Sequence, residues 1–125
     1  MNGEDKRTTK RKTGDNGEEA VIRLMTKQGF TLLCRNFEIH NIGELDCVFT
    51  KNEDVYVVEV RSRQNRGYYP SSAETVDYRK RLKIERTTER LISRYRLFDR
   101  NIVFLVAQVT HYSSGMIKNI ELIPF

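Results

Sequence analysis

The sequence predicts a single α/β domain in which helices pack on one β-sheet. A helical apolar pattern near residues 15–28 is followed by three short apolar runs, a second helical pattern over 72–95, and two more apolar runs. Such an order of helix and strand segments is typical of a single layered α/β architecture. The length of 125 residues allows one hydrophobic core and is too short for two.

The charge and cysteine content narrow the class of protein. The chain has 22 Lys and Arg against 17 Asp and Glu, and the net charge of +5 favours an anionic partner such as nucleic acid. Cys34 and Cys47 have no CxxC spacing, so we expect buried thiols in a reducing cytoplasm and neither a zinc site nor a disulfide framework. No apolar run resembles a signal peptide or reaches the ~20 residues of a membrane span, which predicts a soluble cytoplasmic protein without a membrane partner.

Residues 1–13 are rich in cations and almost free of apolar side chains. Such a segment buries too little to offset the entropy of ordering. We therefore expect a flexible basic arm over 1–13 and a single folded domain over 14–125. The arm is either a solvated tail or a contact for phosphates.

The first helix is predicted from Asp15 to Lys27 or Gln28, with Gly29 as its C-terminal stop. Asp15 and Glu18 have the spacing of a capping box. Glu18 also falls on the apolar side of the helix, together with Val21, Ile22 and Met25. Glu18 therefore fits two roles, the cap and a functional acid that points toward the sheet.

Three strands are predicted next, over Phe30–Asn36, Gly43–Thr50 and Val55–Ser62. The connections between them are short and polar, which favours an antiparallel meander. Val55–Ser62 is continuous enough in β-branched residues to be the central strand. Two final strands are predicted over Ile102–Val109 and Met116–Ile123.

Between these groups lie a loop over Gln64–Ser72 and a long helix over Ser72–Tyr95, capped by Ser71 or Ser72. Tyr68 and Tyr69 in the loop could stack on bases or pack the loop. The inward side of the helix is predicted to comprise Ile84, Thr88, Leu91 and Tyr95. Lys80 continues this row at its amino-terminal end, where we expect it to extend to water, with a role in a site as the alternative.

Two predicted strands carry carboxylates inside apolar runs. Alternation places Glu59, Arg61 and Arg63 on one side of the third strand. If the strand register brings Asp46 beside Glu59, the two like charges favour a cation between them, and oxygen ligands suit Mg²⁺ or Mn²⁺. Such an ion could support phosphodiester hydrolysis, with Glu18 completing the site.

The alternative for the same residues is structural. Asp46 and Glu59 could form a buried ion pair with Arg61 or Lys80 and hold no metal. His40 and His111 are isolated in the sequence and are interpreted as structural.

A family resemblance rests on motifs over residues 14 to 85. The sequence resembles the bacterial family typified by YraN, which is similar to archaeal Holliday-junction resolvases and to the PD-(D/E)xK nuclease superfamily. The matching motifs are Gly17-Glu18, Gly29-Phe30, Arg35-Asn36, Gly43-Glu44-Leu45-Asp46 and Val57-Val58-Glu59-Val60-Arg61-Ser62-Arg63, with Ala73, Val76 and Lys80 after them.

The resemblance implies a restriction-endonuclease-like mixed sheet: helix, three-stranded meander, helix, two strands. It implies that Asp46 and Glu59 are ligands of Mg²⁺ or Mn²⁺, that Glu18 is an auxiliary acid, and that Arg61 occupies the position of the catalytic lysine. Related resolvases act as symmetric dimers, which implies a homodimer here.

Arg61 departs from the Glu-Val-Lys pattern of the family. Arginine stays charged, so it can support a phosphorus centre electrostatically but cannot transfer a proton. Lys80 is the candidate for a substitute cation. Val103-Phe104-Leu105 also stands where the family tends to carry Arg-Phe-Asp.

Two hypotheses about function follow from these residues. The first is a nuclease-like protein that acts on branched or structured DNA, possessing the catalytic set Glu18, Asp46, Glu59, Arg61 and Lys80. The second is a nucleic-acid-binding module that kept the fold and lost the chemistry. In both, the phosphate contacts are expected from Arg63, Arg79, Arg81, Lys83 and Arg86. A third and weaker hypothesis is a protein-interaction scaffold.

Overall fold

The computed structural model describes residues 9–64 and 76–125, with side chains from residue 16 onward. It contains, in order, α1 (Thr9–Lys27), β1 (Thr31–Ile39), β2 (Gly43–Lys51), β3 (Asp54–Gln64), α2 (Tyr78–Tyr95), β4 (Asn101–His111) and β5 (Ile117–Pro124). The predicted order of one helix, three strands, one helix and two strands is confirmed.

The strands form one five-stranded sheet in the order β1-β2-β3-β4-β5. β1, β2 and β3 pair antiparallel, β3 and β4 pair parallel, and β4 and β5 pair antiparallel. Parallel neighbours need a crossover, and α2 lies within the connection from β3 to β4. The expected mixed sheet and the central position of β3 are therefore confirmed.

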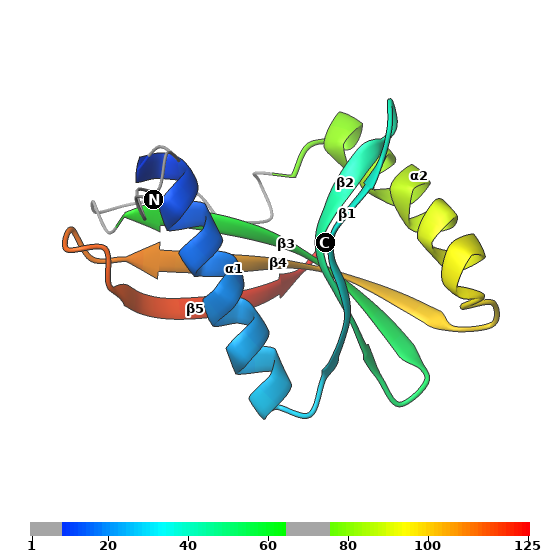
Figure 1. Ribbon diagram of the computed structural model, residues 1–125, viewed down its shortest axis with the longest axis horizontal. Coiled ribbons are helices and arrows are strands. Elements are labelled where there is room, and N and C mark those ends of the chain that lie inside the picture. Colours follow the sequence, from blue (N-terminus) through cyan, green and yellow to red (C-terminus); the bar gives the residue numbers. More distant parts are fainter. Residues whose placement is uncertain (1–8, 65–75) are drawn as a thin grey trace, which may run out of the picture.

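The two helices cover opposite faces of the sheet, because alternate residues of β3 enter different cores. Val55 and Val57 join Ile84 and Leu91 of α2 in one cluster, and Val58 joins α1 in the other, against Val21 and Met25. In Figure 1, α1 crosses in front of β3 and β4, and α2 lies at the other end beside the β1–β2 hairpin. No helix in the described ranges is long and apolar enough to cross a membrane.

The predicted start of the first helix is wrong. α1 begins at Thr9, so Asp15 lies inside the helix and cannot be its N-cap. Lys and Arg are good helix formers, which allows the helix to extend beyond its apolar stripe. Residues 9–13 of the predicted arm therefore belong to α1, and residues 1–8 lie outside the described part.

The predicted start of the second helix is also wrong. α2 begins at Tyr78 with Asp77 as its N-cap, whose side chain accepts a hydrogen bond from the Lys80 amide at 2.8 Å. Ser71, Ser72, Tyr68 and Tyr69 fall in the stretch 65–75, outside the described residues. At the other end α2 stops at Tyr95, as predicted.

The inward face of α2 differs from the prediction at its last position. Ile84, Thr88 and Leu91 are buried as expected, and Thr87 joins them. Tyr95 is 40% exposed, and its ring lies 6.3 Å from that of Phe37 at the edge of the core.

Candidate functional site

Asp46 and Glu59 lie side by side where β2 and β3 separate. The antiparallel pairing runs from Lys51↔Asp54 to Cys47↔Val58, and one further step along both strands gives Asp46 and Glu59. There a side chain replaces the backbone as the hydrogen-bond acceptor between the two strands: Oδ2 of Asp46 accepts a hydrogen bond from the Val60 amide at 2.8 Å. The register, which the sequence left open, therefore brings Asp46 beside Glu59.

A backbone irregularity in β1 coincides with the same position. Asn36 lies across from Asp46, between the pairs Arg35↔Cys47 and Phe37↔Leu45. Its φ of 53° is in the left-handed region, which asparagine tolerates better than most residues. The side chains of β2 change faces at this point: Leu45 packs with the α2 core, whereas Cys47, two residues further on, packs with the α1 core.

Burial and a neighbouring negative charge make the Asp46 carboxyl group a much weaker acid than an exposed aspartate. Desolvation, followed by the negative charge of Glu59, raises the pKa of Asp46 to about 7, against the opposing hydrogen bond from Val60. The charge of Glu18 contributes in the same direction. Near neutral pH the pair therefore favours a proton or a cation.

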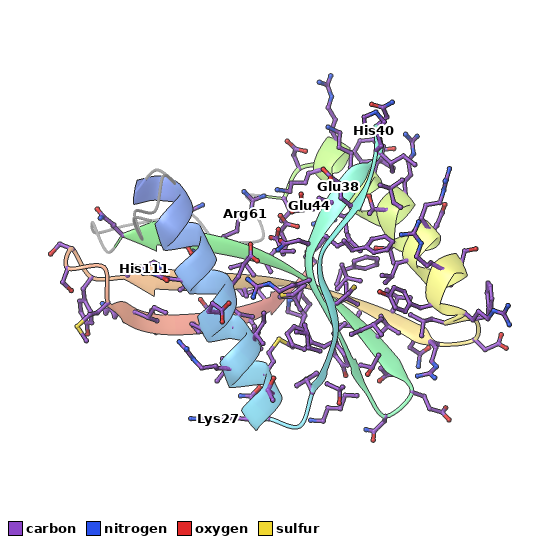
Figure 2. All side chains as sticks on the ribbon, viewed as in Figure 1. Lys27, Glu38, His40, Glu44, Arg61 and His111 are labelled. Carbon is purple, nitrogen blue, oxygen red and sulfur yellow. The ribbon has the colours of Figure 1, made fainter. Side chains whose placement is uncertain are left out.

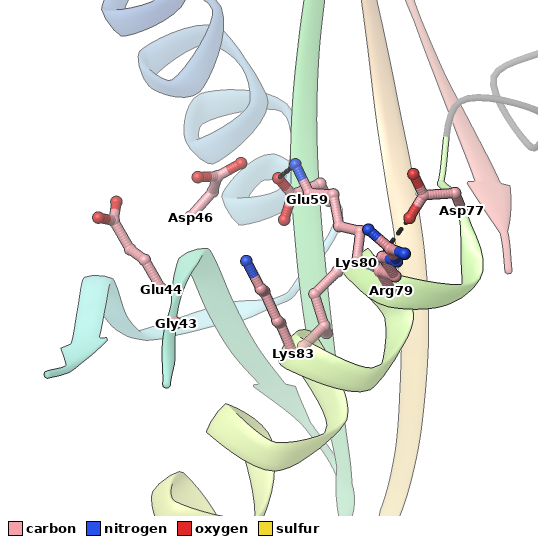
Figure 3. Close-up of a pocket in the computed structure, with 9 residues that line it drawn as sticks. Gly43, Glu44, Asp46, Glu59, Asp77, Arg79, Lys80 and Lys83 are labelled. Atoms are coloured by element: carbon pink, nitrogen blue, oxygen red, sulfur yellow. Dashed lines mark hydrogen bonds and ion pairs between the residues drawn. The ribbon is translucent and has the colours of Figure 1, made fainter. Parts of the chain in front are cut away.

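Lys80 supplies one such cation. Its Nζ lies 2.9 Å from Oε1 of Glu59, which is 8% exposed as a residue, and Figure 3 shows the side chain extending from the first turn of α2 to the carboxylate. The expectation that Lys80 extends to water is wrong. The first turn of α2 borders the same cavity as Glu59, so the side chain reaches the buried carboxylate from there.

Glu18 lies on the α1 side of the site and is held by Arg35. Arg35 of β1 donates to Glu19 at 2.7 Å and to Glu18 at 3.4 Å. The Glu18 side chain is 16% exposed. The cap role proposed for Glu18 is excluded, because the helix begins well before it.

A cavity of about 480 Å³ opens between the start of β2, the middle of β3 and the first turns of α2. Asp46 and Glu59 lie in its wall, and Figure 3 shows Glu44 and Lys83 at its side. The described lining is Gly43, Glu44, Asp46, Glu59, Asp77, Arg79, Lys80, Lys83 and Ile84. The cavity thus carries both acidic and basic groups.

The two arginines that follow Glu59 lie further along β3. Arg61 pairs across from Gln108 and Arg63 from Thr110, and both are partly buried. Figure 2 places Arg61 on β3 between α1 and the hairpin, and it is not in the described lining of the cavity. Alternation keeps both arginines on the side of β3 that carries Glu59.

The residues of α2 that were predicted to contact phosphate do not lie on one surface. Arg79 and Lys83 line the cavity, and Arg86 is exposed one turn further on. Arg81 instead lies over the ring of Phe125, at 5.8 Å. Neither histidine is in the described lining of the cavity: Figure 2 shows His40 at the hairpin tip and His111 near the end of β4.

Two contributors were not identified from the sequence. Arg35 gave no signal beyond its place in a motif, because its acidic partners are 16 and 17 residues away. Asp77 could have been recognised as a helix cap, since it comes directly before the run of helix formers that begins at Tyr78.

The donor set fits a divalent cation of small size. Within residues 9–64 and 76–125, no three His, Cys, Asp or Glu side chains group as a complete metal site. Mg²⁺ is commonly held by one or two carboxylates with water in its other positions, and Asp46 with Glu59 provide such a pair.

The fold and site define an α/β protein with an acidic pair on a mixed sheet beside a basic helix. A family model described as "Uncharacterised protein family UPF0102" matches residues 17–109, and the chain belongs to that family. A UPF0102 protein of Clostridium acetobutylicum is 38% identical over 99 residues, covering 79% of this chain and 80% of its own. Another, of Acetivibrio thermocellus, is 30% identical over 121 residues, covering 94% and 92%. The resemblance to the YraN-type family is thereby confirmed.

Proposed function

We propose that this protein is a nuclease-like protein that acts on DNA, with Asp46 and Glu59 as ligands of Mg²⁺ or Mn²⁺. The observation that carries the proposal is the acidic pair itself. Two carboxylates from adjacent strands meet in the wall of a cavity that also exposes Arg79 and Lys83. Carboxylates beside cations match a phosphodiester together with its metal ion.

The local electrostatics support a bound cation. The Asp46 pKa of about 7 reflects desolvation and the repulsion from Glu59, and a divalent ion relieves that repulsion. When bound, the ion would supply an activated water and neutralise charge on the phosphate. Glu18, held by Arg35, adds negative charge near Asp46 and is not in the described lining of the cavity.

Lys80 is suited to the role that a lysine has in related nucleases. It reaches Glu59 from α2, whereas the position on β3 that the resemblance assigns to lysine is Arg61. An ammonium group can hold a water and give up a proton, and a guanidinium group cannot. We assign proton handling to Lys80 and fixed electrostatic support to Arg61, with branched or structured DNA as the substrate class.

One observation favours the second function, a DNA-binding module without catalysis. Lys80 lies 2.9 Å from Glu59, so half of the acidic pair is neutralised without a metal. This function predicts DNA binding that is independent of divalent ions.

The test is incubation of the protein with nicked, single-stranded and four-way-junction DNA in Mn²⁺. Cleavage that is lost in Asp46→Asn and kept in Glu44→Gln supports the nuclease, since Glu44 is an exposed carboxylate in the same cavity. Cleavage that appears only in Arg61→Lys supports the inactive module. The nuclease proposal fails if wild type cleaves none of the substrates, or if Asp46→Asn cleaves as wild type does.

A further inference from the structure

The exposed charges of α2 are segregated on two flanks of the helix. At 3.6 residues per turn, five cations fall within a stripe about 80° wide. We call this the cationic stripe, and it comprises the exposed residues Arg79, Lys83, Arg86, Arg90 and Arg94. The stripe contains no acidic residue.

Contacts place the cationic stripe along the β1–β2 hairpin. Arg94 lies over the ring of Phe37 at 5.2 Å. Near the other end, a Cβ on Gly43 would lie 2.7 Å from the Thr87 hydroxyl and 3.5 Å from the Lys83 carbonyl oxygen, so the hairpin packs closely on α2.

The opposite flank of α2 has mixed charge. Glu85 and Glu89 lie there with Arg81, which is one turn before Glu85. Arg81 and Glu85 border a small cavity with Phe104 and Phe125 at the end of the sheet. Arg81, expected from the sequence to contact phosphate together with Arg79 and Lys83, thus belongs to a different surface.

The arrangement of the stripe is unfavourable for the helix itself. Arg79–Lys83, Arg86–Arg90 and Arg90–Arg94 are like-charge pairs at i,i+4, each of which destabilises a helix by roughly 0.2–0.5 kcal/mol. The first turn contains no acidic residue, and its cations oppose the helix dipole. The contact with Phe37 accounts for Arg94 alone, whereas an anionic ligand along the stripe accounts for all five cations.

The dimensions of the stripe match a nucleic-acid backbone. From Arg79 to Arg94 the helix rises about 22 Å, at 1.5 Å per residue. One strand of a duplex has a phosphate every ~3.4 Å along its axis, so the stripe spans several consecutive phosphates. Its first two members also line the cavity that holds Asp46 and Glu59.

We infer that the cationic stripe binds one phosphodiester strand and leads it along α2 into the acidic cavity. This inference rests on the proposed function for the role of the cavity. Binding of the strand by the cationic stripe is argued from the charges and geometry of α2 alone. Arg90 and Arg94 are therefore nucleic-acid contacts, and Arg81 is not.

The test is DNA binding in EDTA, measured by fluorescence anisotropy over a salt series. The labelled ligand is an oligonucleotide longer than the stripe, as a single strand and as a duplex. Arg86→Gln/Arg90→Gln removes two charges from the stripe. Arg23→Gln/Arg81→Gln removes two exposed charges elsewhere and is the matched control.

For the preferred form of DNA, the slope of log K against log salt is expected to become less negative by about 1.4 to 1.8 in the stripe variant, the value for two lost phosphate contacts. The control variant is expected to keep the wild-type slope. Equal changes of the slope in both variants would refute strand binding by the cationic stripe. The nuclease proposal would remain, because cleavage tests it separately. Absence of binding by wild type to either form at low salt would refute strand binding by the cationic stripe as well.

Discussion

Asp46 sits where burial, a like charge and one backbone hydrogen bond compete. Desolvation and Glu59 outweigh the bond from Val60, which is why the pKa of Asp46 rises to about 7 from an ordinary value of 3.8. Between these two pH values the Asp46 carboxyl group is protonated in the folded protein, whereas in the unfolded chain it is ionised. The resulting stability is present below the ordinary pKa and is lost as the pH rises through about 7.

Asp46→Asn is therefore expected to gain stability relative to wild type as the pH rises. Asparagine keeps an oxygen that can accept from Val60 and cannot ionise. Between about pH 4 and pH 8, the difference in unfolding free energy should shift in favour of the variant by roughly 1–3 kcal/mol. Denaturant unfolding in EDTA at several pH values measures it. A difference that does not change with pH would contradict the assigned pKa and its cause.

Lys80 is the second residue with a specific energetic role. Lys80→Met removes the ammonium from Glu59 and leaves a buried carboxylate without that partner. Because the Lys80 side chain is 38% exposed, solvent screens the pair, and we expect a loss of about 1–2 kcal/mol in unfolding free energy. Lys83→Met, in the same cavity, is the control. Equal stability of the two variants in denaturant unfolding would show that the ion pair does not support the fold.

At the scale of elements, the close approach of α1 to β3 depends on Gly17. A Cβ at this position would overlap the Ser62 hydroxyl and contact Val109. The glycine therefore allows α1 to lie close to the sheet. This close packing also fixes the position of the following residue, Glu18.

Gly17→Ala tests this packing. Alanine is the better helix former by about 1 kcal/mol, but the Ser62 hydroxyl must turn aside to admit the methyl group, which is expected to cancel part of that gain. In the background of Ser62→Gly, which removes the hydroxyl, the same change should stabilise the protein by more than it does in wild type. Thermal and denaturant unfolding of the four proteins give the coupling. Additive effects would rule out the proposed contact.

The elements also show what the sequence could and could not predict. The strands were found because apolar runs and short polar turns are local signals, and β3 was recognised as central from its β-branched residues. Both helix starts were missed. The cations before Asp15 carry no apolar periodicity, and Asp77 was overlooked in favour of the serines further upstream.

For the whole molecule, strand patterns and a family motif identified Asp46 and Glu59 as carboxylates inside apolar strands, but their placement side by side depended on a strand register that the sequence left open. The position of Lys80 could not be predicted, because it depends on how α2 packs against the sheet and where its first turn begins. The ion pair between Arg35 and Glu18 likewise depends on the packing of elements that are distant in the sequence. The same holds for the surfaces that the two charged flanks of α2 face. Local patterns thus identified the acidic pair, and tertiary packing determined its partners.

The central claim is that Asp46 and Glu59 form a divalent-cation site. Titration of the protein with Mn²⁺, followed by electron paramagnetic resonance of the free ion, tests it directly. Wild type is expected to bind Mn²⁺ at one site, which is lost in Asp46→Asn and retained in Glu44→Gln. Absence of a site in wild type, or equal binding by wild type and Asp46→Asn, would contradict it.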